Sequence, residues 1–333
     1  MTSDQSALEG FEDDPDAGPP LPAPSEVIEE IATSSGAVAS DRLRALSEAK
    51  DETLGQFVAL WPRLEAERRR EVLVWLERLS DEDPTLDFHR IHLSALRDQD
   101  AATRILAVKG LWEEERLEYM FLLIDQVRDD PEPTVRAAVA DLLGQWVVSG
   151  EFGMLSDDDI DTLTSALREA IDDIDEEEEV RARALEALGA YSHESIAELI
   201  GEAYEAGSAR MRLASLRAMG RNAADEWMPV LLYNFDDDDL EIRVAAATAA
   251  GELLLEVAID PLTELLEDDE EDVQLAAILA LGEIAGDDVE RVLTAILGRP
   301  EEHLVAAAQE ALNGVRMLSL DFDDPGDDGD DDE

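Results

Sequence analysis

Val180-Arg181-Ala182-Arg183-Ala184-Leu185-Glu186-Ala187-Leu188-Gly189 is the clearest copy of a ten-residue stretch that occurs seven times along the chain. The copies begin at Thr103, Val135, Val180, Met211, Ile242, Val273 and Leu304. Successive starts are 32, 45, 31, 31, 31 and 31 residues apart. A period in this range indicates an array of repeated supersecondary units.

Each copy has the apolar pattern of one helical face. Counting from its first residue, apolar or small residues fall at offsets 0, 4, 7 and 8. Glycine at offset 9, in five copies, predicts a helix end or a close approach of neighbouring backbones. A second apolar helix lies between copies, for example at 196–204, and a single pair of helices cannot bury its apolar side alone. We therefore predict an all-α fold, an α-solenoid of stacked antiparallel helix pairs.

An acidic and a basic residue recur at fixed places in the repeat. Arginine occupies offset 1 in the first five copies, and aspartate precedes most copies by five residues. An aspartate ahead of a helix can cap its free N–H groups, and its recurrence predicts an Asp–Arg ladder between adjacent repeats. Anion binding by the arginines is the alternative. The predicted ladder comprises Asp98, Arg104, Asp130, Arg136, Asp175, Arg181, Arg212, Asp237, Arg243 and Asp268.

The spacing Asp-x4-Val-Arg-x2-Ala-x3-Leu-Gly, from Asp175 to Gly189, resembles the short HEAT-like repeats first named from phycobilisome lyases. The resemblance covers residues 98–316 well and 41–97 loosely. It implies a HEAT-like superhelix, but such repeats serve many roles, so it implies no particular activity.

Composition divides the chain into three parts. Residues 1–40 form an acidic tail that we expect to be largely disordered, although 25–33 can form a short helix. Residues 41–316 form a solenoid of about seven to eight repeats, with an insertion near 149–174 that is a candidate contact site. Residues 317–333 form a second acidic, disordered tail.

The charge restricts the class of partner. The chain has 83 acidic and 26 basic residues, a formal charge of −57. Such a charge repels nucleic-acid phosphates and anionic membranes. A high-salt cytoplasm, a basic protein partner and ordinary solubility remain as explanations. The sequence has no cysteine, no leader-like segment and no apolar run of membrane-spanning length, so we expect a cytoplasmic location.

A partner-binding surface is predicted where side chains point away from the helical core. At 100° per residue these are offsets 2, 6 and 9, although close stacking of repeats can also cover them. The predicted stripe comprises Ile105, Lys109, Trp112, Leu213, Arg217, Arg221, Val244, Thr248, Leu275 and Leu279.

No catalytic constellation is recognisable. The sequence has no Gly-rich phosphate loop and no Cys nucleophile. HEAT-like deoxyhypusine hydroxylases bind iron through repeated His-Glu dipeptides, whereas this chain has only His193-Glu194. We therefore expect no catalytic residue, no metal and no cofactor. The predicted function is a monomeric, non-catalytic scaffold or adaptor that binds a protein partner through the solenoid groove. An accessory or maturation factor of lyase type, and an acidic decoy or chaperone for a basic protein, are the alternatives.

Overall fold

The computed structural model describes residues 21–34, 36, 39–112, 114 and 116–322. Its regular elements are all helices within those ranges, as predicted. The chain divides into two compact units, Met1–Trp112 and Glu113–Glu333, where the sequence predicts one array over 41–316. The most N-terminal and C-terminal stretches of the predicted tails, 1–20 and 323–333, lie outside the described residues.

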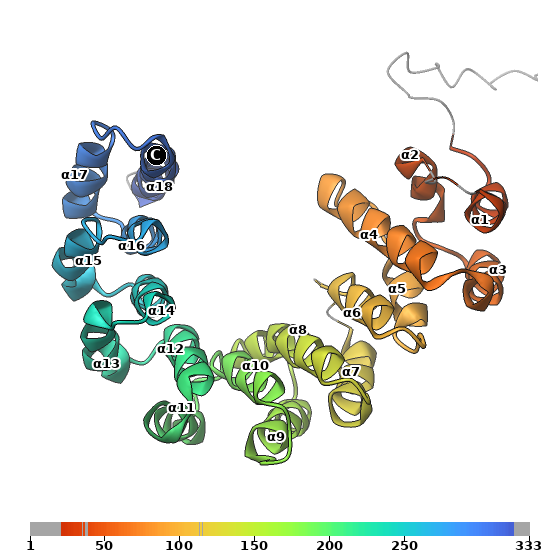
Figure 1. Ribbon diagram of the computed structural model, residues 1–333, viewed down its shortest axis with the longest axis horizontal. Coiled ribbons are helices and arrows are strands. Elements are labelled where there is room, and N and C mark those ends of the chain that lie inside the picture. Colours follow the sequence, from red (N-terminus) through yellow and green to blue (C-terminus); the bar gives the residue numbers. More distant parts are fainter. Residues whose placement is uncertain (1–20, 35, 37–38, 113, 115, 323–333) are drawn as a thin grey trace, which may run out of the picture. The chain divides into compact units, whose positions relative to one another are not determined.

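The second unit consists of two rows of helices (Figure 1). Each helix of the inner row packs against the next helix of that row, and each helix of the outer row packs against the inner helix that follows it. The inner row is α8 (Pro133–Glu151), α10 (Glu178–Leu188), α12 (Ala209–Asn222), α14 (Leu240–Glu252), α16 (Glu271–Ile284) and α18 (Glu302–Phe322). The outer row is α7 (Leu117–Asp129), α9 (Asp157–Asp172), α11 (Glu194–Ala206), α13 (Met228–Tyr233), α15 (Ile259–Leu265) and α17 (Asp287–Ile296).

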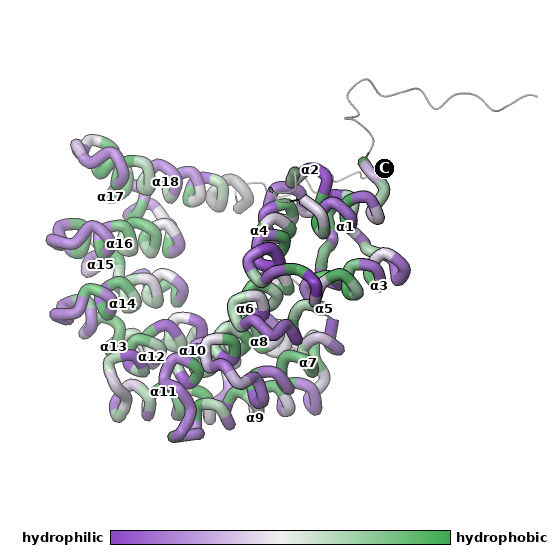
Figure 2. The backbone as a smooth tube through the Cα atoms, turned by 45° about the vertical axis from the view of Figure 1, so that its right-hand side comes forward, coloured by the Kyte–Doolittle hydropathy of each residue, from purple (hydrophilic) through white to green (hydrophobic). Residues whose placement is uncertain are grey.

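Hydropathy follows this arrangement. Along each helix of the second unit, hydrophobic and hydrophilic stretches alternate (Figure 2). An inner helix has neighbours on three sides, so its buried stripe is wide: α10 buries Val180, Ala184 and Leu188, and also Ala182 and Glu186. The apolar pattern at offsets 0, 4, 7 and 8 thus lies in the core of each pair.

Glycine at offset 9 lets consecutive inner helices touch. In each case it faces the alanine at offset 7 of the next copy. A methyl group built on Gly251 would lie 2.6 Å from Cα of Ala280, and one on Gly189 would lie 2.7 Å from Cα of Ala218. Of the two roles expected for this glycine, close approach requires glycine at Gly189, Gly220, Gly251 and Gly282, whereas a methyl group on Gly144 would make an ordinary contact with Ala187 at 3.4 Å.

Asp98, Asp130, Asp237 and Asp268, which precede four of the seven copies, organise the turns between helices. The carboxylate of Asp268 accepts a hydrogen bond from the backbone N–H of Glu270 at 2.9 Å. The backbone carbonyl of Asp268 accepts a second hydrogen bond, from Nε2 of Gln274, at 2.6 Å. Arg104, Arg136 and Arg243 make the same contact to the carbonyls of Asp98, Asp130 and Asp237. Glutamine at offset 1 therefore preserves the contact that arginine makes within a repeat.

Arginines also link one repeat to the next. Arg212 lies 2.5 Å from the carboxylate of Asp237, and Arg243 lies 2.9 Å from that of Asp268. The hydrogen bond from Asp239 N–H and the ion pair with Arg212 lower the pKa of Asp237, against the effect of burial. Each of these ion pairs joins an inner helix to the turn of the following repeat.

The predicted ladder is wrong at Asp175. Arg136 binds Glu176 instead, with both carboxylate oxygens within 2.7 Å. In this longer repeat Asp173 caps the turn by accepting the N–H of Asp175, so the turn is shifted by two residues. For the same reason Arg181 donates to the carbonyl of Ile171 rather than to an aspartate.

The helix considered for residues 25–33 is present as α1 (Pro24–Thr33) and packs against α3 (Asp51–Leu60). It buries Val27, Ile28 and Ile31, so this part of the predicted tail belongs to the first unit. The remaining helices of that unit are α2 (Ser40–Leu43), α4 (Ala66–Glu82), α5 (His89–Ala95) and α6 (Ala101–Lys109). At the other end of the chain, α18 continues to Phe322, within the stretch 317–333 that the sequence assigns to the C-terminal tail.

His92 on α5 is buried against Gly110, with 1% of its surface exposed. A methyl group on Gly110 would overlap the imidazole ring, so only glycine fits beside it. Burial lowers the pKa of His92 to about 4, helped by the charge of His89 and opposed by a hydrogen bond with the backbone of Leu106. His92 is therefore neutral at pH 7.

We predict that Gly251→Ala destabilises the second unit by about 1–3 kcal/mol, because the new methyl group meets the backbone of α16. Helix propensity alone would favour alanine by about 0.5–1 kcal/mol. The matched control is Gly314→Ala on α18, where a methyl group meets no atom within 4 Å. Urea unfolding measures both; equal stability of the two variants would contradict the close-contact argument.

We also predict an acid-sensitive contribution from His92. Its folded pKa is about 4, below the unfolded value of about 6.5, so the unfolded chain binds the proton more tightly. The free energy of unfolding should fall by about 3 kcal/mol as pH drops from 6.5 to 4. Urea unfolding at several pH values should show a shallower decline in His92→Gln, whatever its stability at pH 7.5. An unchanged slope would show that His92 is not the group responsible.

Candidate functional site

The predicted stripe falls in both units. Ile105 and Lys109 lie on α6 and Trp112 follows that helix, with Lys109 and Trp112 exposed. The other seven residues lie on three consecutive inner helices of the second unit, α12, α14 and α16. This group, which the structure brings together, is Leu213, Arg217, Arg221, Val244, Thr248, Leu275 and Leu279.

The stripe is open at its centre and covered along one edge. At offset 6, Thr248 is exposed and 53% of Leu279 is exposed. At offset 2, Val244 and Leu275 are half-buried, and Leu213 is buried with 6% exposed. Offsets 2 and 6 differ by 40° around a helix, so offset 2 faces the neighbouring helix. The prediction that Leu213 is exposed is therefore wrong.

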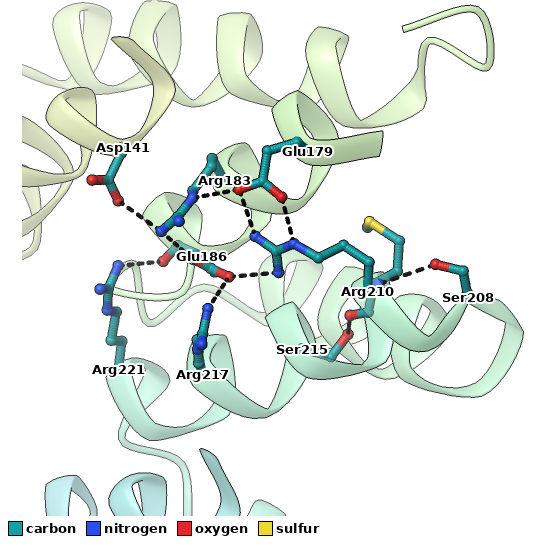
Figure 3. A network of polar contacts seen from close by, with 10 residues as sticks. Asp141, Glu179, Arg183, Glu186, Ser208, Arg210, Ser215, Arg217 and Arg221 are labelled. Carbon is teal, nitrogen blue, oxygen red and sulfur yellow. Dashed lines mark hydrogen bonds and ion pairs between the residues drawn. The ribbon is translucent and has the colours of Figure 1, made fainter. Parts of the chain in front are cut away.

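A network of arginines surrounds one buried glutamate on this face (Figure 3). Glu186 of α10 is 1% exposed, and its carboxylate accepts from Arg183 at 3.2 Å, Arg210 at 3.0 Å and Arg217 at 3.2 Å. Arg221 donates to the carbonyl of Glu186 at 3.0 Å. A carboxylate removed from water requires such donors, and here they come from the same helix and the next one.

Two further carboxylates complete the network. Glu179 binds Arg210 at 2.7 Å and Arg183 at 2.9 Å, while Asp141 of α8 lies 3.7 Å from Arg183. The hydrogen bond from Arg210 is the main reason that the pKa of Glu179 falls to about 2, against the effect of burial. The network thus links three inner helices, and four guanidinium groups face three carboxylates. It is a local area of low negative charge in a strongly acidic chain.

The inner face becomes acidic beyond α12. Glu252 and Glu283 occupy the position of Arg221 in the next two copies, at offset 10. Their carboxylates lie against Gly220 and Gly251 of the preceding helices. Burial raises the pKa of both glutamates, while Arg221 lowers that of Glu252. The inner face therefore changes from one helix to the next. It presents the guanidinium groups of Arg217 and Arg221 on α12, the hydroxyl of Thr248 on α14 and the apolar side chain of Leu279 on α16. Glu252 and Glu283 add carboxylates on α14 and α16.

A family model of HEAT repeats matches residues 228–313, from α13 into α18. The same two-row arrangement continues through α7 to α12, outside the match. The chain is a HEAT-like repeat protein. Among curated proteins, none matches its sequence.

Several solved structures are similar to this HEAT-like protein. Escherichia coli YibA is 19% identical, with a TM-score of 0.42 over 71% of this chain and 95% of the other. Human deoxyhypusine hydroxylase in complex with glycerol is 18% identical, with a TM-score of 0.36 over 88% and 96%. Kap95p, bound to RanGDP, is 14% identical, with a TM-score of 0.48 over 87% of this chain and 45% of Kap95p.

Each of the four histidines of this HEAT-like protein has its own surroundings or contact partner. His92 is buried, His89 contacts Asp87, His193 caps α11 by accepting the N–H of Ser195, and His303 contacts Glu271. Within the described part of the chain, no three His, Cys, Asp or Glu side chains gather as they would around a metal ion. Nor does any described helix combine the length and apolar composition of a membrane span.

The Glu186 network was not predicted, although the sequence contains a signal for it. Offset 6 is Glu186 in one copy and Arg217 in the next, 31 residues later. Opposite charges at equal offsets in adjacent repeats are expected to face each other once the inner helices stack. The contributions of Arg183 and Arg210 are less visible, because they come from offsets 3 and −1.

We predict that Glu186→Gln destabilises the second unit by about 3 kcal/mol or more, because three guanidinium groups then lose their shared buried charge. The control is Glu310→Gln, the same offset in the last copy, where the residue is exposed. That variant should change stability by less than about 0.5 kcal/mol. Urea unfolding at pH 7 compares them; similar effects would indicate that the network does not stabilise the fold.

Proposed function

We propose that this HEAT-like protein is a non-catalytic scaffold that holds a protein partner along the inner face of α12, α14 and α16. The observation that carries the proposal is the open centre of the stripe, where Thr248 and Leu279 are exposed beside Arg217 and Arg221. Arg217, Thr248 and Leu279 occupy the same offset on successive inner helices, so a partner laid along the row would meet a cation, a hydroxyl and an apolar side chain in turn. A monomeric state and a cytoplasmic location are parts of this proposal.

The dimensions of the face suit an extended polypeptide. Packed helices lie about 8–10 Å apart, and an extended chain advances about 3.3 Å per residue. A segment that crosses the inner row would therefore place about one residue in three against each successive helix. Over α12, α14 and α16, a segment of about six residues would meet Arg217, Thr248 and Leu279 in turn.

The overall charge favours a partner that is basic. A chain of charge −57 attracts cations and speeds their encounter with its surface. On the inner row, Glu252 of α14 and Glu283 of α16 add two carboxylates. The same charge argues against direct binding of nucleic acid. The phycobilisome-lyase subtype of the repeat remains a prediction from the sequence motif alone.

A double variant tests the inner face. Thr248→Gln/Leu279→Gln changes the shape of the open centre without changing charge. We expect the protein that wild type retains from an extract of the source organism, identified by mass spectrometry, to bind this variant at least about tenfold more weakly by calorimetry.

The control is Tyr233→Gln on the outer helix α13, where 76% of the tyrosine is exposed. This variant should bind as wild type does, and circular dichroism should show that both variants are folded. Equal retention of the partner by wild type and by the double variant would contradict the proposed binding face.

A further inference from the structure

An open groove of about 870 Å³ lies in the outer row of the second unit, between α15 and α17. These two helices lie side by side on the side of the unit opposite the inner face (Figure 1). The groove is therefore separate from the stripe discussed above. Its volume falls in the range of about 300–1,000 Å³ that is usual for ligand pockets.

The groove follows from the way the repeats stack. The inner helices α14 and α16 are in backbone contact, because Gly251 leaves room for Ala280. The second unit curves with its inner row on the concave side (Figure 1), so the outer helices diverge. Between α15 and α17 the facing side chains include Thr263 and Ala295, which are too small to fill the space.

The floor of the groove is apolar. Leu266 and Ile296 are buried beneath it, and Ile259 and Val292 are half-buried along it. Val257, at the edge, has 55% of its surface exposed. Apolar side chains that line a concave surface favour an apolar ligand group over water.

The rim carries uncompensated negative charge. Its two guanidinium groups are already engaged, Arg291 by Asp288 and Arg299 by Glu267 and the carbonyl of Leu266. The other two rim carboxylates, Glu256 and Asp260, are exposed and form no ion pair within the described residues. The rim therefore attracts a cation, in keeping with the charge of the whole chain.

We propose that this groove is a second docking site, which takes a short basic amphipathic segment of a protein partner. Apolar side chains of the segment cover Val257 and Val292, and its Lys or Arg side chains pair with Glu256 and Asp260. With seven residues, α15 is about 10 Å long, so the groove holds roughly two helical turns of a bound segment. The scaffold can then hold two segments at once, one on each row.

The test uses a defined probe, a fluorescein-labelled 14-residue helical peptide of leucine and lysine with all leucines on one face. Its controls are a scrambled peptide of the same composition and a peptide with glutamate in place of lysine. Binding is followed by fluorescence anisotropy at 0.15 M and 0.5 M KCl. We expect the amphipathic peptide to bind at least tenfold more tightly than the scrambled one.

Two pairs of variants separate the groove from the general field of the protein. Glu256→Gln/Asp260→Asn and Val257→Gln/Ala295→Gln should each weaken binding at least tenfold. Glu194→Gln/Glu198→Gln removes the same charge from another outer-row position and should change binding less than twofold. The proposal would be overturned if Glu256→Gln/Asp260→Asn and Glu194→Gln/Glu198→Gln weakened peptide binding equally. It would also be overturned if Val257→Gln/Ala295→Gln bound the peptide as wild type does.

Direct crosslinking locates the peptide. The chain has no cysteine, so Val257→Cys and Tyr233→Cys each create a single attachment point for a benzophenone crosslinker. Light should join the peptide to position 257 and not to position 233. Crosslinking at both positions would show non-specific attraction. The inner-face variant Thr248→Gln/Leu279→Gln should bind the peptide as wild type does, so either proposal can fail without the other.

Discussion

The contact between a glycine of one inner helix and an alanine of the next is the constraint on which the second unit depends. Five such contacts occur in succession, and in the last four the following helix fills the space that a side chain on the glycine would need. Because the inner helices are this close, the arginines at offset 1 reach the next turn, and Arg210 and Arg217 reach Glu186 on the helix before them. The same closeness makes the outer row diverge and leaves a groove between α15 and α17.

The charges of the second unit are divided between two roles. Its fourteen basic residues are all arginine, and each contacts a carboxylate or a backbone carbonyl of the same unit. Arginine suits this role because its planar group donates several hydrogen bonds in fixed directions. Most of these arginines join one helix to another helix or to a turn, whereas Arg168 and Arg291 pair with carboxylates of their own helices. A basic partner would meet carboxylates that no internal cation neutralises.

The sequence predicts the helix pairs and their stacking, because these follow from a period of 31 residues and from helical spacing, and it gives close contact as one of two roles for the glycine. The predicted exposure of Leu213 is wrong, because the angle of a residue around its own helix does not show how near the flanking helices lie. The predicted ladder is wrong at Asp175 because the longer repeat changes the turn, and the cap moves to Asp173. The arginines around Glu186 come from different offsets, and only the stacked structure shows that they converge.

The use of arginine alone in the second unit has a consequence for chemical modification. The chain has lysine only at Lys50 and Lys109, and both are exposed in the first unit. Acetylation of side-chain amines and attachment of ubiquitin require lysine, so residues 113–333 offer no target for either. Amine-reactive dyes and crosslinkers are restricted in the same way. A lysine-directed signal for turnover or regulation on this chain would therefore modify the first unit.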